Sequence, residues 1–260
     1  MNNLVSIIMP NYNGSRFIAP AINSVLNQTY SNWELIIVDD KSKDESIDII
    51  QTFVDKDIRI KLYKLDENKG VSYARNFAIS KLNGRFMAFL DSDDIWLPEK
   101  LEKQLLFMTQ NNFSFTYLAY EKINHNGKVI GRVNAPEKIS YYDLLKTCYP
   151  GCLTVMLDIN YLGEVYIPLN TKREDYALWL KLIKKTNSAF GLNQVLAQYR
   201  IHSGQSSRIK FHMAKETWNL YRDLEKLSFL KSIFYFLNYA IRGVFRTYIT
   251  VIARKLNNKH

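Results

Sequence analysis

Four short apolar segments recur through the first 112 residues, each followed by a polar loop and a segment in which apolar residues have helical spacing. The apolar segments cover residues 5–9, 35–38, 58–65 and 86–90. Short apolar runs that end at turn residues predict buried strands, and the amphipathic segments between them predict helices. Strands and helices that alternate in this way form a mostly parallel sheet with helices on both faces. The sequence therefore predicts an α/β fold with a doubly wound central sheet.

From about residue 113 the pattern changes and predicts that the sheet becomes mixed. Segments 115–123 and 128–133 flank His125-Asn126-Gly127, and Asn-Gly is a typical hairpin turn. Residues 153–157 and 195–199 predict two further short strands, and residues 176–183 have helical periodicity. We expect a domain of residues 1–207, with halves 1–112 and 113–207, followed by a helical tail of residues 208–260.

Three carboxylates follow the fourth apolar segment within four residues: Asp91, Asp93 and Asp94. Ionised carboxylates this close repel each other unless a hard divalent cation or a donor-rich ligand neutralises them. A solvated acidic turn that caps the helix beginning near Pro98 is the alternative interpretation. The segment is therefore a candidate cation site.

Polar residues also follow the first and second apolar segments. Asn11 and Tyr12 come after the first, and Asp39 and Asp40 come after the second. In open sheets of this kind, ligands bind beyond the carboxyl ends of the strands. We expect one cleft to collect these residues together with the acidic turn.

Composition and charge restrict the class of protein. With 260 residues, 47% of them hydrophobic, the chain can bury a full core. Cys148 and Cys152 are too few for a disulfide framework and predict core thiols, with half a metal site as the alternative, and we see no leader segment; these features predict a reducing, cytoplasmic setting. Residues 208–260 carry 11 Lys or Arg against 3 acidic residues, a net charge of +8 out of +10. This asymmetry argues against a nucleic-acid binder and for an anionic partner at the tail.

The tail predicts a basic amphipathic helix. On a helical projection one side carries Ser228, Lys231, Tyr235, Asn238, Arg242 and Arg246, and the other carries Leu230, Ile233, Leu237, Ala240, Ile241, Val244, Tyr248 and Val251. The charges interrupt every apolar run before it could span a bilayer. We expect the helix to lie in the plane of an anionic membrane surface. Packing on the catalytic domain or on another subunit is the alternative.

Five ordered motifs resemble those of glycosyltransferase family 2: VSIIMPNYN at 5–13, SVLNQT at 24–29, VDDKS at 38–42, NKGVSYARN at 68–76 and LDSDDIWLP at 90–98. The resemblance covers roughly residues 4–205. It implies a GT-A fold with a mostly parallel sheet, a mixed C-terminal half and a helical tail. It also implies an inverting transferase that uses a nucleotide-sugar, with residues 1–112 binding the donor and 113–207 the acceptor.

The resemblance implies a role for the acidic turn in holding Mn²⁺ or Mg²⁺. Asp93 would be a direct ligand, Asp91 would hold the ribose or a metal-bound water, and Asp94 would support or cap. His202 would complete the metal sphere and Arg200 would meet the diphosphate. A divalent cation suits this task because negative charge grows on the diphosphate as the glycosidic bond breaks.

Other donor contacts follow from the same resemblance. Tyr12 would stack on the base, Asp40 would accept from a ring N–H group, and Pro10 would contribute its backbone; uracil fits this pair best. Arg75 matches a position that contacts the nucleotide, with a surface salt bridge as the alternative.

Residues 172–176, with the sequence KREDY, resemble the family's Glu-Asp motif at the start of a helix. The resemblance assigns the catalytic base to Asp175 and an acceptor contact to Glu174. Inversion needs such a base, because the acceptor hydroxyl must lose its proton as its oxygen attacks opposite the departing diphosphate. A simple helix N-cap is the alternative for Asp175.

These features together predict a hexosyl- or N-acetylhexosaminyltransferase that uses a UDP-sugar and a lipid-linked or oligosaccharide acceptor in bacterial capsule, O-antigen or lipooligosaccharide synthesis. We expect it in the cytoplasm, peripheral on the inner face of the cell membrane, and homo-oligomer formation is left open. The alternatives are a sugar nucleotidyltransferase and a membrane-associated nucleotide- or glycan-binding protein without catalysis. The loop after the first strand has one Gly and no Lys, which disfavours the nucleotidyltransferase.

Overall fold

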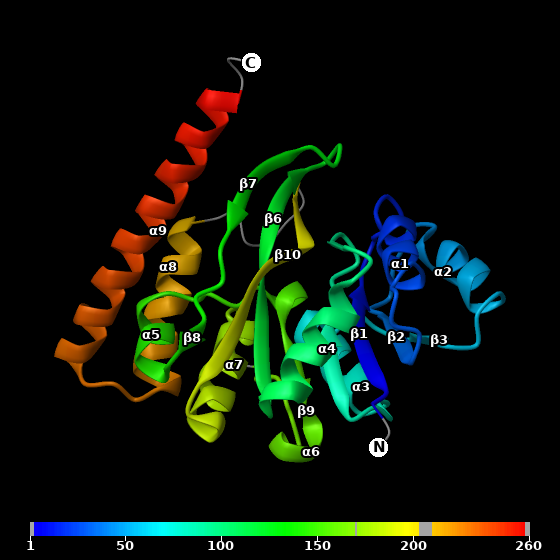
Figure 1. Ribbon diagram of the computed structural model, residues 1–260, viewed down its shortest axis with the longest axis horizontal. Helices are drawn as coiled ribbons and strands as arrows, with labels where there is room; N and C mark the ends of the chain where they lie inside the picture. Colours follow the sequence, from blue (N-terminus) through cyan, green and yellow to red (C-terminus); the bar gives the residue numbers. More distant parts are fainter. Residues whose placement is uncertain (1–2, 170, 203–209, 258–260) are drawn as a thin grey trace.

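The computed structural model describes the chain except for residues 1–2, 170, 203–209 and 258–260 (Figure 1). Side chains are described up to residue 243, except for the residues just named and residues 210–212. Helices α1 and α2 lie at one end of the molecule and the long helix α9 at the other, with the sheet between them (Figure 1). None of the helices in the described part of the chain is both long and apolar enough to cross a membrane.

The first half has the predicted alternation of strands and helices. Its elements are β1 (Val5–Asn11), α1 (Ile18–Leu26), β2 (Trp33–Asp39), α2 (Ser46–Val54), β3 (Ile60–Lys64), α3 (Val71–Ile79) and β4 (Phe86–Phe89). These strands pair in parallel in the order β3-β2-β1-β4. The strand order reverses beside β1, so the carboxyl ends of β1, β2 and β4 meet at one edge of the sheet.

The second half makes the sheet mixed, as predicted. Its elements are β5 (Ile95–Trp96), α4 (Lys100–Asn111), β6 (Phe115–Asn124), β7 (Val129–Val133), β8 (Lys138–Ile139), α5 (Tyr141–Lys146), η1 (Cys152–Thr154), β9 (Met156–Asp158), α6 (Ile159–Leu162), α7 (Glu174–Thr186), β10 (Ala189–Ile201), α8 (Lys210–Asn219), η3 (Leu220–Leu224) and α9 (Phe229–Asn257). Strand β9 joins β4 to β6 in antiparallel pairs, and β6 runs parallel to β10. The complete order is β3-β2-β1-β4-β9-β6-β10-β5, with β7 on β6 and β8 on β10.

The core consists of two apolar layers, one on each face of the sheet. Successive residues of a strand point to opposite faces. Accordingly Ile8 of β1 belongs to one buried cluster, whereas Ile7 and Met9 belong to the other. Because both faces are covered, β1 and β2 are buried along their whole length. This is the burial expected of central strands in a sheet with two helical layers.

Some predicted strands have different bounds. Ile58, predicted to begin the third strand, lies outside β3 and is 93% exposed. Pairing with β2 begins only at Ile60, and the Asp57 side chain accepts from the Arg59 backbone N–H in a turn that precedes it. The predicted strand 153–157 begins instead as the short 3₁₀ helix η1, and the strand predicted at 195–199 extends over all of β10.

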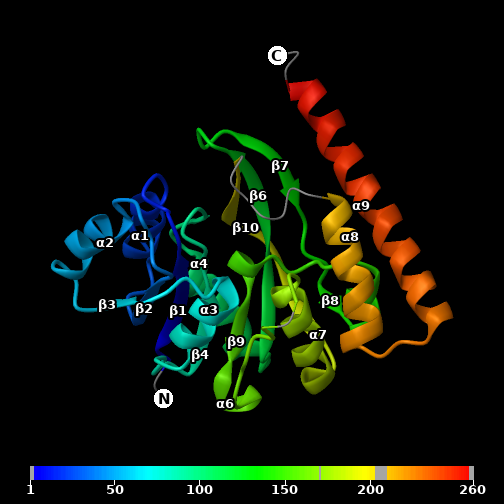
Figure 2. The same cartoon turned by 180° about the vertical axis from the view of Figure 1, so that it is seen from behind.

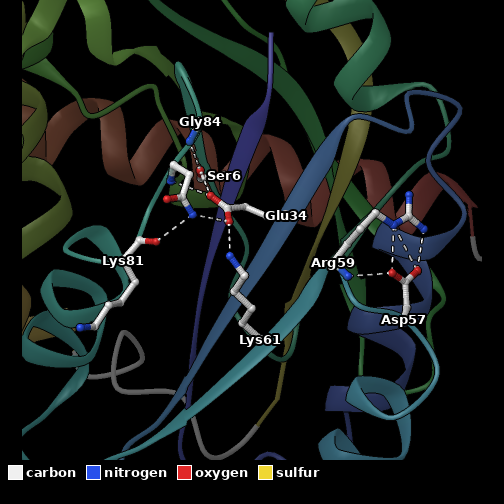
Figure 3. Close-up of polar contacts among 8 residues, drawn as sticks. Ser6, Glu34, Asp57, Arg59, Lys61, Lys81 and Gly84 are labelled. Atoms are coloured by element: carbon white, nitrogen blue, oxygen red, sulfur yellow. Dashed lines mark hydrogen bonds and ion pairs between the residues drawn. The ribbon is translucent and has the colours of Figure 1, made fainter. Parts of the chain in front are cut away.

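A polar cluster ties the amino ends of the strands together (Figure 3). Glu34, at the start of β2, accepts hydrogen bonds from Ser6 Oγ at 2.6 Å and Lys61 Nζ at 2.8 Å. It also accepts from the Asn83 backbone N–H at 2.7 Å, and Gly84 N donates to Ser6 Oγ at 2.9 Å. One buried carboxylate therefore connects β1, β2, β3 and the loop before β4.

The tail packs on the rest of the molecule with one side and leaves another exposed. Figure 2 shows α8 and α9 side by side next to α7. Tyr235, predicted on the polar side, packs on the core together with Phe236 and Tyr239. The apolar side is the exposed one: Phe229, Leu230, Phe234, Leu237 and Ile241 are all exposed. We call these five residues the outer face of α9.

The packing of the tail begins before α9. Leu220 and Tyr221 of η3 are buried in the same cluster as Tyr176 of α7. The predicted boundary at residues 207 and 208 lies outside the described residues, so the division into two domains stays a prediction. The side chains of Val244, Arg246, Tyr248 and Val251 also lie outside what the structure describes.

Candidate functional site

The carboxyl ends of β1 and β2 lie next to each other. Parallel pairing places Pro10 opposite Val38 and Asn11 opposite Asp39. The buried Asn11 amide donates to Asp39 Oδ1 at 2.8 Å, so the two strand ends are held together. Tyr12 follows β1 and is 48% exposed. Its ring can therefore be covered by a planar ligand.

Asp40 directly follows β2 and is fixed against the start of α3. Its carboxylate accepts from the backbone N–H groups of Lys69 at 2.7 Å and Gly70 at 2.8 Å. Gly70 has a φ of 88°, a conformation that glycine adopts without strain. Each carboxylate oxygen has two lone pairs, so Asp40 keeps the capacity to accept one more N–H group.

Arg75 connects the acidic turn to the start of α7. Its guanidinium is buried and donates to Asp91 Oδ1 at 2.5 Å and to Glu174 Oε1 at 3.3 Å. Burial opposes the charge, but the Asp91 and Glu174 carboxylates raise the pKa of Arg75 well above its usual value. Arg75 therefore does form salt bridges, but its guanidinium is buried rather than at the surface, and its contact with the nucleotide stays a prediction. Arg75 brings together two motifs that are far apart in the sequence.

Glu174 and Asp175 occupy the first turn of α7. Burial and the neighbouring Asp175 carboxylate raise the pKa of Glu174 to about 7, although Arg75 opposes this shift. Asp175 is half-buried, and its Oδ1 accepts from Tyr176 N at 2.6 Å. Glu174 can therefore change protonation near neutral pH, as a group that contacts an acceptor hydroxyl could use.

Cys152 shows how close these charges are to one another. Burial raises the pKa of its thiol, Asp91, Asp175 and Glu174 raise it further, and Arg75 lowers it. A single thiol that is influenced by all four groups places them in one electrostatic neighbourhood. Cys152 packs against the core, as the sequence predicted, and its thiol also adjoins the candidate site.

The end of β10 is held over the acidic turn. Short antiparallel pairing places Gln198 opposite Ile95, directly after the turn. Arg200 N then donates to Asp94 Oδ1 at 2.8 Å, and Arg200 Nε donates to the Asp93 backbone oxygen at 2.8 Å. Asp94 is buried and supports β10 rather than capping α4, whose N-cap residue is Glu99. Burial and the nearby Asp93 and Asp91 raise the pKa of Asp94 well above its usual value.

Asp93 and His202 are joined by a hydrogen bond. Asp93 Oδ2 and His202 Nε2 are 2.9 Å apart, and both side chains are partly exposed. Mg²⁺ and Mn²⁺ accept carboxylate and imidazole ligands and commonly keep positions for water and substrate phosphates. Within the described ranges, no group of three or more His, Cys, Asp or Glu residues could form a complete metal centre. The pair therefore fits an ion shared with a phosphate ligand rather than an enclosed structural metal.

Phe17 belongs to this site but was not among the predicted residues. Its ring centroid lies 4.9 Å from that of His202, and the Arg200 and Arg16 guanidinium carbons lie 4.9 and 5.0 Å from it. Phe17 is the N-cap residue of α1. Its position just after the loop that follows β1 was the one feature of the sequence that could have placed it near the site. The ring is a contact surface for Arg200 of β10 and for His202, which follows β10.

The comparisons with known proteins identify a family. Residues 6–159, more than half of the chain, match the family model of glycosyl transferase family 2. The chain is 43% identical over 242 residues to "Putative teichuronic acid biosynthesis glycosyltransferase TuaG" of Bacillus subtilis, covering 93% of this chain and 96% of that protein. It is 45% identical over 242 residues to "UDP-Glc:alpha-D-GlcNAc-diphosphoundecaprenol beta-1,3-glucosyltransferase WfgD" of Escherichia coli, covering 93% and 94%.

Solved structures show the same fold. TarS of S. aureus (residues 1–349), solved in complex with UDP-GlcNAc, superimposes with a TM-score of 0.68 at 22% identity, covering 84% of this chain and 66% of that chain. The mannosyltransferase PcManGT of Pyrobaculum calidifontis, solved with GDP-Man and Mn²⁺, gives 0.67 at 14% identity, covering 87% and 65%. The chain thus spans about two thirds of these solved chains. The predicted GT-A type of fold is confirmed.

Proposed function

Because the chain belongs to glycosyl transferase family 2, we propose that it moves a sugar, with inversion, from a UDP-sugar to a hydroxyl of a lipid-linked glycan acceptor. The predicted glycosyltransferase activity follows from the family and from relatives along nearly the whole chain. The donor and acceptor classes are proposed because WfgD is named for UDP-Glc and a diphosphoundecaprenol acceptor. The chain would then act in bacterial surface-polysaccharide synthesis and transfer a hexosyl or N-acetylhexosaminyl group.

One observation carries this proposal more than any other. Arg75 contacts Asp91 on the donor side and Glu174 on the acceptor side through one buried guanidinium. Sugar transfer requires donor and acceptor groups to meet in one place, because attack depends on close approach of the reacting atoms. The two motifs meet here although they are distant in sequence.

The donor would lie across the carboxyl ends of β1, β2 and β4. Tyr12 would stack on the uracil, Asp40 would accept its ring N–H, and the Pro10 backbone would border the base. Asp91, oriented by Arg75, would hold the ribose or a metal-bound water. The exposed Tyr12 ring and the remaining lone pairs of Asp40 support these roles.

Asp93 and His202 would hold a Mn²⁺ or Mg²⁺ ion together with the diphosphate. When bound, the ion would offset the negative charge that grows on the leaving diphosphate. Arg200 would support the same task, because its guanidinium is held beside Asp93. Phe17 would keep His202 and Arg200 in place through its ring contacts.

Asp175 would act as the base that removes the proton from the acceptor hydroxyl. It lies in the first turn of α7, directly after Glu174. Glu174, whose pKa is about 7, would exchange a hydrogen bond with the acceptor. The acceptor oxygen would then attack the anomeric carbon on the side opposite the diphosphate.

The outer face of α9 would lie on the inner surface of the cell membrane. Its five exposed apolar side chains are accompanied by a tail with a net charge of +8, which suits an anionic bilayer. A lipid-linked acceptor in the same membrane would meet the enzyme there. Other occupants of this face, such as a second copy of the chain, are outcomes of the vesicle test below.

A donor panel tests the proposed function. The purified chain is incubated with Mn²⁺, a synthetic GlcNAc-diphospholipid and UDP-Glc, UDP-GlcNAc, UDP-Gal or GDP-Man. We expect transfer from at least one UDP-sugar and loss of transfer in excess chelator. Hydrolysis or transfer from GDP-Man alone would contradict the uracil assignment, and absence of transfer from every sugar would contradict the proposed function.

A flotation assay with phosphatidylglycerol vesicles tests the membrane role. Leu237→Asp should reduce vesicle binding about tenfold or more, because it places a charge in the buried apolar contact. Leu106→Asp is the matched control, since Leu106 of α4 is similarly exposed (52%, against 54% for Leu237). Equal loss in both variants, or a dimer that Leu237→Asp dissociates, would contradict the membrane surface as the partner.

A further inference from the structure

The residue before the Glu-Asp motif is held by α9. Arg173 Nη2 donates a hydrogen bond to the Tyr239 hydroxyl. The Arg173 guanidinium carbon lies 5.2 Å from the centre of the Tyr176 ring and 5.4 Å from that of Tyr239. The two rings are stacked, 6.1 Å apart with an interplanar angle of 22°. The guanidinium thus lies beside one ring of α7 and one of α9.

Arg173 depends on few polar partners. Its Nε is buried and has no hydrogen-bond partner among the described residues. Burial opposes its charge, whereas Tyr239 and Asp175 raise the pKa of Arg173. The Tyr239 hydroxyl therefore accepts a hydrogen bond from a partly buried guanidinium whose charge interacts with the Asp175 carboxylate.

The start of α7 is held by contacts from the end of the chain. Its N-cap position, Arg173, makes no side-chain capping hydrogen bond. Tyr176 Oη contacts Tyr221 Oη of η3 at 3.2 Å and donates to the Leu144 carbonyl at 2.8 Å. Together with Tyr239, these contacts fix the first turn of α7 from η3 and α9. Two segments beyond residue 208 therefore share in placing the Glu-Asp motif.

We infer that Tyr239 is a positioning residue for sugar transfer, which acts through Arg173 to hold Asp175 in place. The inference rests on the proposed function, because it takes Asp175 as the base. It also gives α9 a second role: its outer face contacts the membrane, and its inner side orders the acid–base motif. A change in how α9 packs would then change the rate of transfer without a change in donor binding.

Tyr239→Phe tests this inference, because it keeps the stacked ring and removes only the hydroxyl. We expect kcat to fall about tenfold, because one hydrogen bond to a charged group is lost. The KM for the UDP-sugar should stay within about twofold of the wild type. The matched control is Tyr235→Phe, which removes a hydroxyl from the same side of α9, one turn earlier. The control should leave kcat within about twofold.

A double-mutant cycle with Arg173→Met separates positioning from a general loss of stability. If Tyr239 acts through Arg173, the double variant should have the kcat of Arg173→Met alone, whereas independent effects would multiply. Three outcomes with an active wild type would overturn the inference. They are an unchanged kcat in Tyr239→Phe, a change in Tyr239→Phe that is confined to KM, and effects of the two substitutions that multiply in the double variant. A wild-type chain without transfer would overturn the proposed function and this inference with it.

Discussion

Glu34 is buried and Glu174 largely buried, but the two glutamates lie at opposite ends of the sheet and have different partners. Glu34, at the amino end of β2, accepts from Ser6, Lys61 and Asn83, and although burial opposes its charge these bonds lower the pKa of Glu34 (Figure 3). Glu174, at the carboxyl end, shares the single Arg75 guanidinium with Asp91, and burial raises its pKa to about 7.

The difference separates a carboxylate that stabilises the fold from one that is available for chemistry. A buried carboxylate with enough donors is ionised and rigid. A buried carboxylate with too few donors costs stability, and such groups are common where a ligand supplies the missing contacts. The comparison predicts that substitutions at the carboxyl end change transfer more than stability, and that Glu34 does the reverse.

The largest effect is expected for Asp175→Asn. The amide cannot accept the acceptor's proton, so kcat should fall about 10²–10⁴-fold, while UDP binding measured by calorimetry and the free energy of unfolding stay close to the wild type. Full activity in Asp175→Asn would remove this carboxylate from the reaction and make the N-cap alternative correct.

Asp93→Ala should have the next largest effect. In the presence of Mn²⁺, UDP affinity should fall about 100-fold, because a charged ligand of the ion contributes about 3 kcal/mol. In chelator, the variant and the wild type should bind UDP equally. A chelator-independent loss would show that Asp93 supports the fold rather than an ion.

Glu34→Gln should act in the opposite way. We expect a loss of about 2 kcal/mol in the free energy of unfolding in urea at pH 7, because Lys61 loses its charged partner, with kcat unchanged. The lowered pKa means that the carboxylate's stabilisation is present above the unfolded-state pKa and is lost as pH falls through the folded-state value. The difference between variant and wild type should therefore shrink in acid.

The last effect, similar in size to that of Glu34→Gln, is the pH dependence of Glu174→Gln. Glu174 faces Asp175 on its own helix, Arg75 of α3, Asp91 after β4, and Cys152 of η1. Because its folded-state pKa is raised, the native state binds its proton more tightly, and the stability this contributes at low pH is lost as pH rises through about 7. The variant lacks this loss, so its stability relative to wild type should rise by about 2 kcal/mol between pH 5 and 8. A constant difference would contradict the assignment.

The sequence was sufficient for features that depend on local pattern. Strand ends rich in Asn and Asp located the candidate site, and alternation predicted the sheet. The prediction of strand bounds was wrong where pairing with the neighbouring strand sets them. Ile58 continues the alternation of apolar residues but lies before the first residue that pairs with β2. The projection also placed Tyr235 on the polar side of α9, whereas its aromatic ring packs against the core.

The remaining features depend on contacts between distant residues. Arg75 is separated from Glu174 by 99 positions, and Arg173 from Tyr239 by 66. No spacing rule in the sequence relates such pairs. The salt bridges of Arg75 and the contact between Arg173 and α9 therefore could be found only in the three-dimensional structure. Phe17 is similar, because its role comes from side chains at the end of β10.

A crystal structure with UDP and Mn²⁺ tests the central claim most directly. The account predicts an ion in contact with Asp93 and His202, uracil stacked on Tyr12 beside Asp40, and an open space next to Asp175 for the acceptor hydroxyl. UDP bound away from the carboxyl ends of β1, β2 and β4, or an ion without Asp93 among its ligands, would contradict it.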